Sequence, residues 1–553
     1  MEVECPSVTP EVVLKASGHV DRFNDLMTKD VKTQDCFRAD HLLKAHLEAS
    51  LLDPLATPAG RAEMEDALAR LDEYKAADMD VAFARFGVKA PDTKNDLSPV
   101  FEFNLMFATH IGPTGLVRGY MRPETAQGIF VNFRDLLYHN GGKLPFACAQ
   151  IGQSFRNEIA PRAGLLRVRE FTQAEIEHFV HPEHKEHPRF GEVAELTLSL
   201  FSQGAQLDEA RTPLRMTIGE AVRTGIVANQ TLGYFIARCY LFLIRLGVDE
   251  KRLRFRQHLE KEMAHYAEDC WDAEIQCSYG WIECVGMADR SAFDLTAHAA
   301  KSKVDLSAYE KFAQPREVTE LLVEPNKQLL GKELKKEAKA VTDALAALSE
   351  PEALALRDAL ATSGSAQLCG CTLTPDMVRI EHVTRMVSGR SFTPGVIEPS
   401  FGLGRIMYCL FEHCFYWREE DEQRVVLRLT PLVAPIKVSI FPLLSDERLV
   451  GRTTAIATEL TAAGIFNKVD TTGVSIGKRY ARTDEIGVPF AITVDHQTLA
   501  DGTVTLRERD SRDQVRAPSS GVVALVASLV AGAPWATAVA GLPKQAAAKE
   551  EAE

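Results

Sequence analysis

The segment from residue 156 to residue 170 combines several arginines with residues that favour a turn. Pro161 and Gly164 lie between two apolar stretches, a pattern that predicts a β-hairpin with guanidinium groups on both strands. Guanidinium groups bind phosphate oxygens through paired hydrogen bonds, and an aromatic ring such as Phe171 can stack on a purine base. We therefore predict a phosphate-binding hairpin; a hairpin with surface salt bridges is the alternative. Its arginines are Arg156, Arg162, Arg167 and Arg169.

A glycine-rich segment, EPSFGLGRI at 398–406, could supply another arginine. Its pattern predicts a strand, a bend at Gly402 and Gly404, and a helix that begins near Leu403. Arg405 would then lie in the first helical turn and project back towards the strand ends. A tight turn that only packs a helix against a strand has the same pattern, so both interpretations stay open.

Acidic side chains recur in three other segments. Glu124 lies in RPETAQG, Glu283 lies in WIECVG, and the latter segment is followed by Arg290. Glu175 and Glu177 come directly after the arginine-rich segment, and strand alternation places them on one face. Taken alone, each of these carboxylates is better explained as an ordinary surface or salt-bridged residue than as part of a site.

Length and composition indicate a globular protein of two or three domains. The chain has 553 residues, of which 46% are hydrophobic and 25% charged. These values exclude a mostly disordered chain and a protein with many membrane spans. The net charge of −14 excludes a generally basic nucleic-acid coat, although a local basic face is compatible with it. No signal peptide follows Met1, so we predict a cytoplasmic location and leave a mitochondrial form open.

Cysteine and histidine spacing gives no strong metal signature. The 11 cysteines are scattered and form no paired CxxC pattern, so we predict no zinc site. Four histidines recur at every third residue, but Pro182 and Pro188 would break a helix that aligned them. A surface loop is therefore predicted there, with a metal cluster as the alternative. These histidines are His178, His181, His184 and His187.

The chain divides by composition into a long N-terminal part, residues 1–430, and a smaller C-terminal part, residues 431–543. Charged, alanine-rich stretches predict two helical insertions in the first part, at about 53–97 and 301–375. Alternating strand and helix patterns after Pro431 predict a small α/β domain.

The end of the chain carries two further patterns. The uncharged run from Ala517 to Pro543 predicts an amphipathic helix packed on the last domain, with a membrane role as the alternative. The last residues, 544–553, predict a disordered tail because their composition is of low complexity.

The motif segments together resemble class II aminoacyl-tRNA synthetases, whose motifs 2 and 3 are an arginine-rich hairpin and a glycine–arginine helix. Their details resemble the glycyl-tRNA synthetases of the eukaryotic and archaeal type. Only the two predicted insertions and the tail resemble these proteins weakly. The matching segments are RPETAQGIF (122–130), FRNEIAPRAGLLRVREF (155–171), EIEHF (175–179), ECVGMADR (283–290), IEPSFGLGR (397–405) and GKRYARTDEIGVPF (477–490).

The resemblance implies an α+β fold: an antiparallel-sheet catalytic domain with helical insertions and a C-terminal α/β anticodon-binding domain. It implies a glycine–tRNA ligase that forms glycyl-adenylate and pyrophosphate from glycine and ATP, then transfers glycyl to tRNA(Gly). Mg²⁺ is implied as the companion of ATP. The ATP-binding residues implied are Arg156 at the α-phosphate, Arg167 and Arg405 at the γ-phosphate, Glu158 and Val168 at the adenine edge, Phe171 under the ring, Asn157 beside them, and Glu283 and Cys284 where ATP and Mg²⁺ are held.

The glycine site implied by the resemblance surrounds the substrate ammonium with carboxylates, in a void too small for a methyl group. Its residues are Glu124, Glu175, Glu398, Pro399 and Ser400, with Arg290 orienting the substrate. In the last domain, a basic cluster suited to tRNA phosphates consists of Lys478, Arg479 and Arg482. Asp484 and Glu485 could accept from base edges or pair with those cations.

The family forms homodimers through a long motif 1 helix, which precedes the strand that ends near Pro10 in this chain. Because Met1 falls directly at that strand, we expect a weak or mixed oligomer. A non-catalytic relative that binds nucleic acid, such as the accessory subunit of mitochondrial DNA polymerase, is the rival interpretation. The presence of Arg156, Arg405 and the implied glycine site favours the enzyme.

Overall fold

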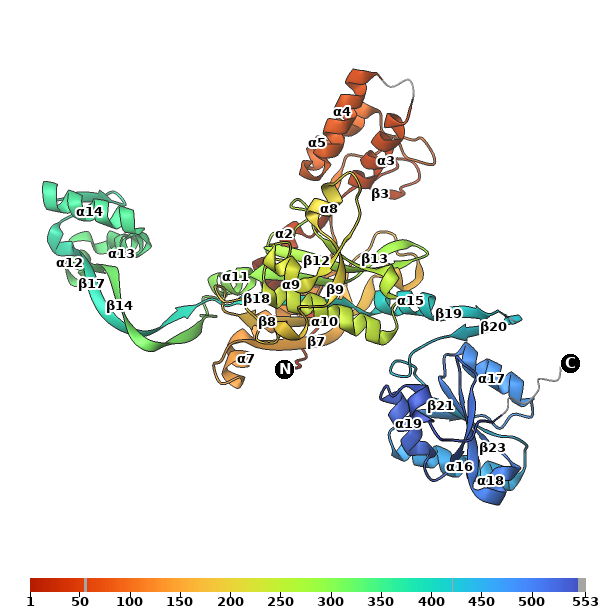
Figure 1. Ribbon diagram of the computed structural model, residues 1–553. Coiled ribbons are helices and arrows are strands. Elements are labelled where there is room, and N and C mark those ends of the chain that lie inside the picture. Colours follow the sequence, from red (N-terminus) through yellow and green to blue (C-terminus); the bar gives the residue numbers. More distant parts are fainter. Residues whose placement is uncertain (54–56, 420, 546–553) are drawn as a thin grey trace. The chain divides into compact units, whose positions relative to one another are not determined.

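The computed structural model describes residues 1–53, 57–419 and 421–545 of the chain (Figure 1). It divides into two compact units. The larger unit comprises Met1–Leu306 and Pro394–Glu553, and the smaller comprises Ser307–Thr393. Each is described by itself below.

An eight-stranded sheet forms the centre of the larger unit, in the order β10-β9-β11-β12-β13-β18-β8-β7. Neighbouring strands are antiparallel except for β9 and β11, which confirms the predicted antiparallel α+β architecture. The strands are β7 (Phe146–Phe155), β8 (Glu170–Val180), β9 (Thr197–Phe201), β10 (Leu214–Thr217), β11 (Leu253–Gln257), β12 (Asp269–Cys277), β13 (Gly280–Ser291) and β18 (Gly395–Gly402).

One face of this sheet is covered by two helices, α10 (Gln230–Leu246) and α15 (Leu403–Cys414), which share an apolar core with it. Strand β12 shows how the sheet separates core from site. Trp271, Ala273 and Ile275 are buried in that core, whereas Cys270 and Asp272 line a cavity on the other face. The shorter helices of this region are α8 (Gln203–Leu207) and α9 (Ile218–Arg223).

The N-terminal segments pack around two three-stranded sheets, β1-β6-β5 and β3-β2-β4. Helices α3, α4 and α5 form a separate small core, so the first predicted insertion is helical in the residues that are described. These elements are β1 (Val8–Pro10), α1 (Glu11–Ala16), α2 (His19–Arg22), β2 (Asn24–Lys29), β3 (Cys36–Arg38), α3 (Ala39–Leu51), α4 (Pro58–Ala69), α5 (Ala76–Phe86), β4 (Phe101–Asn104), β5 (Ala108–Ile111) and β6 (Val117–Met121).

Three helices pack beside the outer strands β7 and β8 through a phenylalanine cluster. Phe130, Phe133, Phe146 and Phe179 are all buried, with the Phe133 and Phe179 ring centroids 4.8 Å apart. The cluster packs on β8, the strand that also carries Glu175 and Glu177. The helices are α6 (Ala126–Val131), α7 (Phe133–His139) and α11 (Phe293–Ser302).

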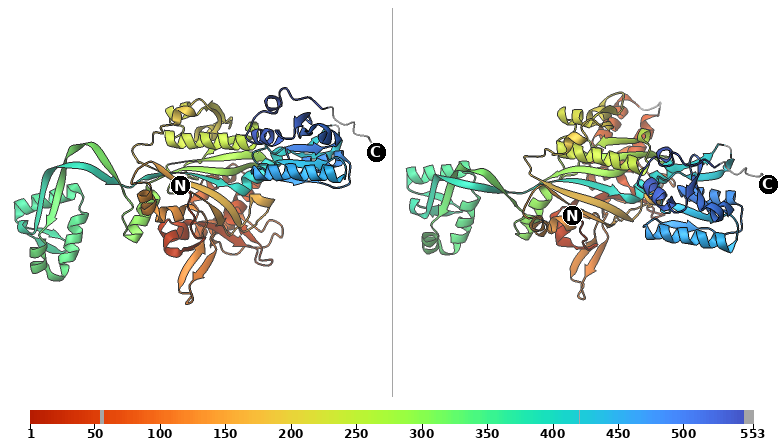
Figure 2. Two further views of the ribbon diagram at one scale, coloured as in Figure 1. Left: turned by 90° about the horizontal axis from the view of Figure 1, so that it is seen from below. Right: turned by 60° about the horizontal axis from the view of Figure 1, so that its bottom comes forward.

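The smaller unit is a long β-ribbon that carries three helices at one end (Figure 2). The ribbon pairs β14 (Ala308–Pro325) with β17 (Val378–Phe392). We expected a helical insertion at 301–375 and a return to the catalytic core at 376, whereas the unit ends at Thr393. The elements at the end are α12 (Lys327–Leu334), α13 (Ala338–Ala347), α14 (Glu350–Ser363), β15 (Ala366–Leu368) and β16 (Cys371–Leu373).

The C-terminal α/β domain has a five-stranded sheet in the order β22-β21-β23-β24-β25. Helices α16 and α19 pack on one face of the sheet and α17 on the other. Its elements are β21 (Val438–Pro442), α16 (Glu447–Ala462), β22 (Asn467–Val469), α17 (Ile476–Glu485), β23 (Phe490–Val494), α18 (His496–Asp501), β24 (Thr503–Glu508), β25 (Gln514–Pro518), α19 (Val522–Val530) and α20 (Trp535–Ala538).

The uncharged run at 517–543 contains the end of β25, then α19 and α20, and its apolar side chains join the domain core. No helix among the described residues has the length and apolar character needed to cross a membrane. In the predicted tail, Lys544 pairs with Val515 and the Gln545 N–H donates to the Gln514 carbonyl. The rest of that tail, 546–553, lies outside the described residues.

Candidate active site

A cavity of about 680 Å³ lies on the face of the central sheet opposite the α10–α15 core. Strands β8, β12, β13 and β18, the first turn of α15 and the loop between β7 and β8 supply its walls. The cavity brings together segments that are more than 280 residues apart in the chain. The predicted site residues that line it are Glu124, Arg156, Glu158, Arg167, Val168, Phe171, Glu175, Glu283, Cys284, Glu398, Ser400 and Arg405.

Arg156 and Phe171 both line the cavity. The guanidinium carbon of Arg156 lies 5.4 Å from the centroid of the Phe171 ring and 5.5 Å from that of Phe23. Arg156 Nε also donates to the Pro123 carbonyl at 3.3 Å. A positive charge and an aromatic face therefore stand side by side, as a nucleotide requires.

Arg405 connects the hairpin loop to the neighbouring strand β13. Its Nε donates to the Leu166 carbonyl at 3.2 Å and its Nη1 to the Glu283 carbonyl at 2.9 Å. Gly402 allows this approach, because a Cβ at that position would lie 3.3 Å from the Cys284 carbonyl oxygen. The glycine–arginine segment thus forms the predicted strand, bend and helix and places its arginine at the cavity wall.

Glu175 also lines the cavity and is held by a dense set of donors. Its Oε2 accepts from the Thr125 N–H and hydroxyl, both at 2.6 Å, and from the Ala126 N–H at 2.8 Å. The Ser400 hydroxyl donates to Oε1 at 2.9 Å and accepts from Gln173 at 2.7 Å. Burial raises the pKa of Glu175 because it disfavours the charged carboxylate. The negative charge of the neighbouring Glu124 raises this pKa further.

Glu124 and Glu398 face Arg290, which is buried beneath them. Arg290 donates to Glu398, lies 3.7 Å from Glu124, and is also bound by Asp294 at 2.7 Å. Tyr266 stacks on its guanidinium at 3.9 Å. Arg290 is 1% exposed and, among the described residues, does not line the cavity. It therefore orients the two glutamates and has no free face for substrate.

The glutamates that line the cavity repel one another in spite of these contacts. Burial raises the pKa of Glu398 to about 8 even though Arg290 opposes the shift, and Glu175 and Glu124 add to the rise. Although burial disfavours the charged form of Glu124 too, His19 at 3.2 Å and Arg290 lower its pKa. A cationic ligand would relieve this repulsion, so the geometry favours an ammonium group.

Asn157 and Pro399, both predicted at the site, are not among the described residues that line the cavity. The Asn157 N–H donates to the Leu105 carbonyl. On β18, Glu398 and Ser400 point to the cavity, so strand alternation directs Pro399 to the opposite face.

A histidine–carboxylate pair in the cavity wall was not predicted. His258 Nε2 lies 2.8 Å from Asp272 Oδ2, and with Cys270 these donor atoms lie within 4.8 Å of one another, so they could hold a metal ion. Although burial favours a neutral imidazole, the Asp272 hydrogen bond raises the pKa of His258 to about 11. No local pattern marks this pair, because His258 follows β11 while Asp272 lies within β12.

The four regularly spaced histidines do not all lie in a surface loop. His178 belongs to β8, where burial lowers its pKa to about 4, and the His187 ring stacks on Tyr234 at 3.7 Å. His181 and His184 form an isolated bridge after the strand. The loop interpretation therefore fits only the middle of the series.

The basic cluster on α17 is divided between surface and interior. Lys478 and Arg482 are exposed, as a phosphate contact requires. Arg479 is 4% exposed and donates to the carbonyls of Pro442 and Leu443 at 2.8 and 3.3 Å, so its prediction as a tRNA contact was wrong. Its guanidinium instead satisfies main-chain oxygens at the end of β21.

Comparison with known proteins agrees with this geometry. Residues 117–414 match the family model described as tRNA synthetase class II core domain (G, H, P, S and T), and residues 437–529 match the one described as anticodon binding domain. The glycine–tRNA ligase of Drosophila melanogaster is 53% identical over 96% of this chain and 70% of its own length. That of Caenorhabditis elegans is 50% identical over 100% and 75%, and that of Methanothrix thermoacetophila 43% over 96% and 88%.

Proposed function

The chain belongs to the glycine–tRNA ligases, which are class II aminoacyl-tRNA synthetases, and on this basis we propose that it attaches glycine to tRNA(Gly) in two steps. The observation that carries the proposal is one cavity lined both by arginines, Arg156 and Arg405, and by three glutamates, Glu124, Glu175 and Glu398. The ATP phosphates require the arginines, and the glycine ammonium requires the glutamates. This combination supports the enzyme over the non-catalytic relative.

In the first step, a carboxylate oxygen of glycine attacks the α-phosphorus of ATP. The bond from that phosphorus to the bridging oxygen breaks, and pyrophosphate leaves with the electron pair. Arg156 stabilises the charge that develops at the α-phosphate, and Arg405 binds the departing phosphates. Both arginines are fixed by hydrogen bonds to carbonyl oxygens, so little reorganisation accompanies the reaction.

Glycine recognition must act through the ammonium and the carboxylate, because the substrate has no side chain. Glu124, Glu175 and Glu398 line the cavity and would bind the ammonium, and hydrogen bonds from Gln127, Thr125 and Arg290 hold them in place. The same fixed groups would exclude any amino acid that carries a side chain. Rejecting a larger substrate by steric clash is easier than rejecting a smaller one.

Mg²⁺ accompanies ATP in this family, and the residues present fit it. Glu283 lines the cavity with an exposed carboxylate, the oxygen ligand that Mg²⁺ prefers. When bound, the ion supplies positive charge at the phosphates. Orientation of the substrates remains the task of the arginines and glutamates.

In the second step, a hydroxyl of the terminal tRNA ribose attacks the glycyl carbonyl carbon. The bond from that carbon to the phosphate oxygen breaks, and AMP leaves as the hydroxyl proton passes to the departing phosphate. We assign tRNA binding to the C-terminal domain, where Lys478 and Arg482 lie exposed one helical turn apart on α17. The oligomeric state of the chain and its cytoplasmic location stay predictions. Sedimentation velocity of the purified chain measures the first.

The proposal is tested by ATP–pyrophosphate exchange with each of the twenty amino acids in turn. We expect exchange with glycine and little with alanine or serine. A matched pair of variants separates the two roles: Arg156→Ala should lower exchange about 10²–10³-fold at every glycine concentration, whereas Glu124→Gln should chiefly raise the KM for glycine. Exchange that is independent of glycine, or absent from folded protein, would refute the proposed function.

A further inference from the structure

A two-stranded hairpin connects the catalytic domain to the C-terminal domain. It consists of β19 (Phe415–Arg418) and β20 (Asp421–Leu427) and lies between the two segments that match family models. Its base is fixed to the catalytic domain, because the Arg428 N–H donates to the Cys414 carbonyl at 2.7 Å and Leu429 is buried in the same core as Cys414. The hairpin is thus attached to the catalytic domain at its base.

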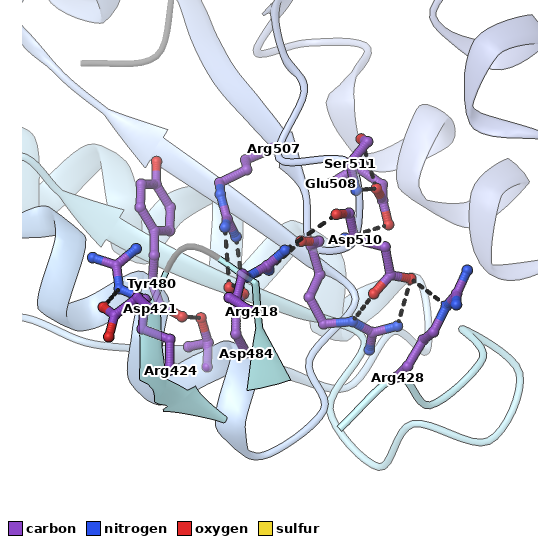
Figure 3. Close-up of polar contacts among 12 residues, drawn as sticks. Arg418, Asp421, Arg424, Arg428, Tyr480, Asp484, Arg507, Glu508, Asp510 and Ser511 are labelled. Carbon is purple, nitrogen blue, oxygen red and sulfur yellow. Dashed lines mark hydrogen bonds and ion pairs between the residues drawn. The ribbon is translucent and has the colours of Figure 1, made fainter. Parts of the chain in front are cut away.

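The far end of the hairpin reaches into the C-terminal domain through Arg418 (Figure 3). Arg418 Nη2 donates to Asp484 Oδ2 at 2.9 Å and to the Arg509 carbonyl at 2.7 Å, and Nη1 donates to the Asp510 carbonyl at 3.2 Å. Arg418 is 6% exposed and Asp484 is 5% exposed. A charge pair desolvated to this degree is tightly restricted in geometry.

Asp484 is bound by a second arginine from within its own domain. Arg507 on β24 donates to Oδ1 at 2.9 Å and to Oδ2 at 3.0 Å, which makes the contact bidentate. The carboxylate thus binds one arginine from the hairpin and one from β24 of its own domain (Figure 3). Because the Asp484–Arg507 pair is internal to the C-terminal domain, it survives when Arg418 is changed.

A second contact lies at the base of the hairpin. Arg509 Nη2 donates to the Leu429 carbonyl at 2.9 Å, and its Nη1 donates to the Gly487 carbonyl at 3.0 Å. A Cβ at Gly487 would lie only 2.8 Å from the Leu429 side chain, so the chain that follows the hairpin packs closely against the C-terminal domain. Contacts at both ends of the hairpin together resist rotation of the domain.

We propose that Arg418 is a positioning residue for tRNA charging: through Asp484 it fixes the C-terminal domain on the catalytic domain, so that a tRNA bound by the former presents its acceptor end to the cavity. This inference rests on the proposed function. A ligand that binds two sites at once gains affinity from the second site only when the spacing of the two sites matches its own length. Glycine activation takes place within the cavity alone and does not depend on that spacing.

The test compares Arg418→Gln with a matched control, Arg516→Gln. Arg516 is also 6% exposed and also binds a carboxylate, at 2.8 Å from Asp495, but this contact lies wholly within the C-terminal domain. Three activities are measured on the full chain: glycine-dependent exchange, charging of full-length tRNA(Gly), and charging of an RNA that contains the acceptor arm alone. The acceptor-arm RNA has no anticodon to engage the C-terminal domain.

Arg418→Gln should lower kcat/KM for full-length tRNA about tenfold or more and leave exchange and acceptor-arm charging within about twofold of the parent. Arg516→Gln should show no such selectivity. Equal losses in all three activities, or unchanged charging of full-length tRNA, would overturn the proposal. Failure of the unmodified chain to exchange with glycine would instead refute the proposed function.

Small-angle X-ray scattering of the same proteins gives a readout that is independent of activity. A loosened domain contact should broaden the distribution of interatomic distances in Arg418→Gln relative to Arg516→Gln. Identical scattering from the two variants would show that Arg418 does not fix the domain, whatever the charging rates.

Discussion

The affinity of the cavity for glycine should rise with pH, because Glu398 must lose a proton before it can pair with an ammonium group. Burial raises the pKa of this carboxyl to about 8, and Glu175 and Glu124 contribute to the rise against the opposing effect of Arg290. Below that pH the empty cavity holds Glu398 mainly as a neutral acid. The glycine ammonium favours the carboxylate, so binding and deprotonation are coupled.

The magnitude follows from the ionised fraction of Glu398. With a pKa of about 8, about half of the molecules carry the carboxylate at pH 8 and about one in a hundred at pH 6. If only the carboxylate form binds, the KM for glycine falls about 50-fold over this range. Neighbouring glutamates titrate together with Glu398, so the measured midpoint belongs to the cluster as a whole.

The assay is glycine-dependent pyrophosphate exchange at saturating ATP from pH 6 to pH 8, with the KM for ATP measured in the same series as the control. Glu398→Gln keeps the shape of the side chain and removes the titrating group. The variant should bind glycine more weakly at pH 8 and lose the steep pH dependence. A flat KM for glycine in the parent, or the same slope in the variant, would refute the reasoning.

Arg156→Ala and Arg405→Ala should each lower exchange about 10²–10³-fold without a change in circular dichroism, because each removes a preorganised positive charge; near-normal exchange in folded protein would place that arginine outside the active site. Removal of all residues after Leu429 should spare exchange and cripple charging of full-length tRNA, and normal charging would contradict the assignment of the C-terminal domain. Gly487→Ala should lower the free energy of unfolding by about 1–3 kcal/mol, because its φ is +79° and its Cβ would clash with Leu429. Gly451→Ala, which meets open space in α16, should leave that free energy unchanged or raise it by up to about 1 kcal/mol, and equal melting temperatures of the two alanine variants would contradict the packing argument.

The chemistry-bearing segments could be predicted because their structure depends on nearby residues. Apolar flanks with Pro161 and Gly164 between them form the expected hairpin of β7 and β8. The run through Gly402 and Arg405 forms the expected strand, bend and helix. Turn preference and side-chain alternation depend on only a few neighbouring residues, so they can be recognised in a single sequence.

The smaller unit could not be predicted in the same way. Strands β14 and β17 pair Ala308 with Phe392 and Pro325 with Val378, so each strand finds its partner across the helices between them. Most of their side chains are exposed, and charged residues are interspersed among the apolar ones along both strands. A long-range pairing of this kind is decided by tertiary contacts.

By itself the sequence determined which charged groups are present and, through the family resemblance, which of them serve ATP and glycine. It did not determine what each charge meets. Glu175 and Glu177 share a strand face as predicted, but only Glu175 lines the cavity, while Glu177 is buried farther along β8. For Asp484 the sequence left two roles open, a contact to a base and a salt bridge. In the structure Asp484 forms ion pairs with Arg418 and Arg507. The partner of a buried ion is supplied by segments distant in the chain, and therefore only the tertiary structure decides between a binding role and a structural one.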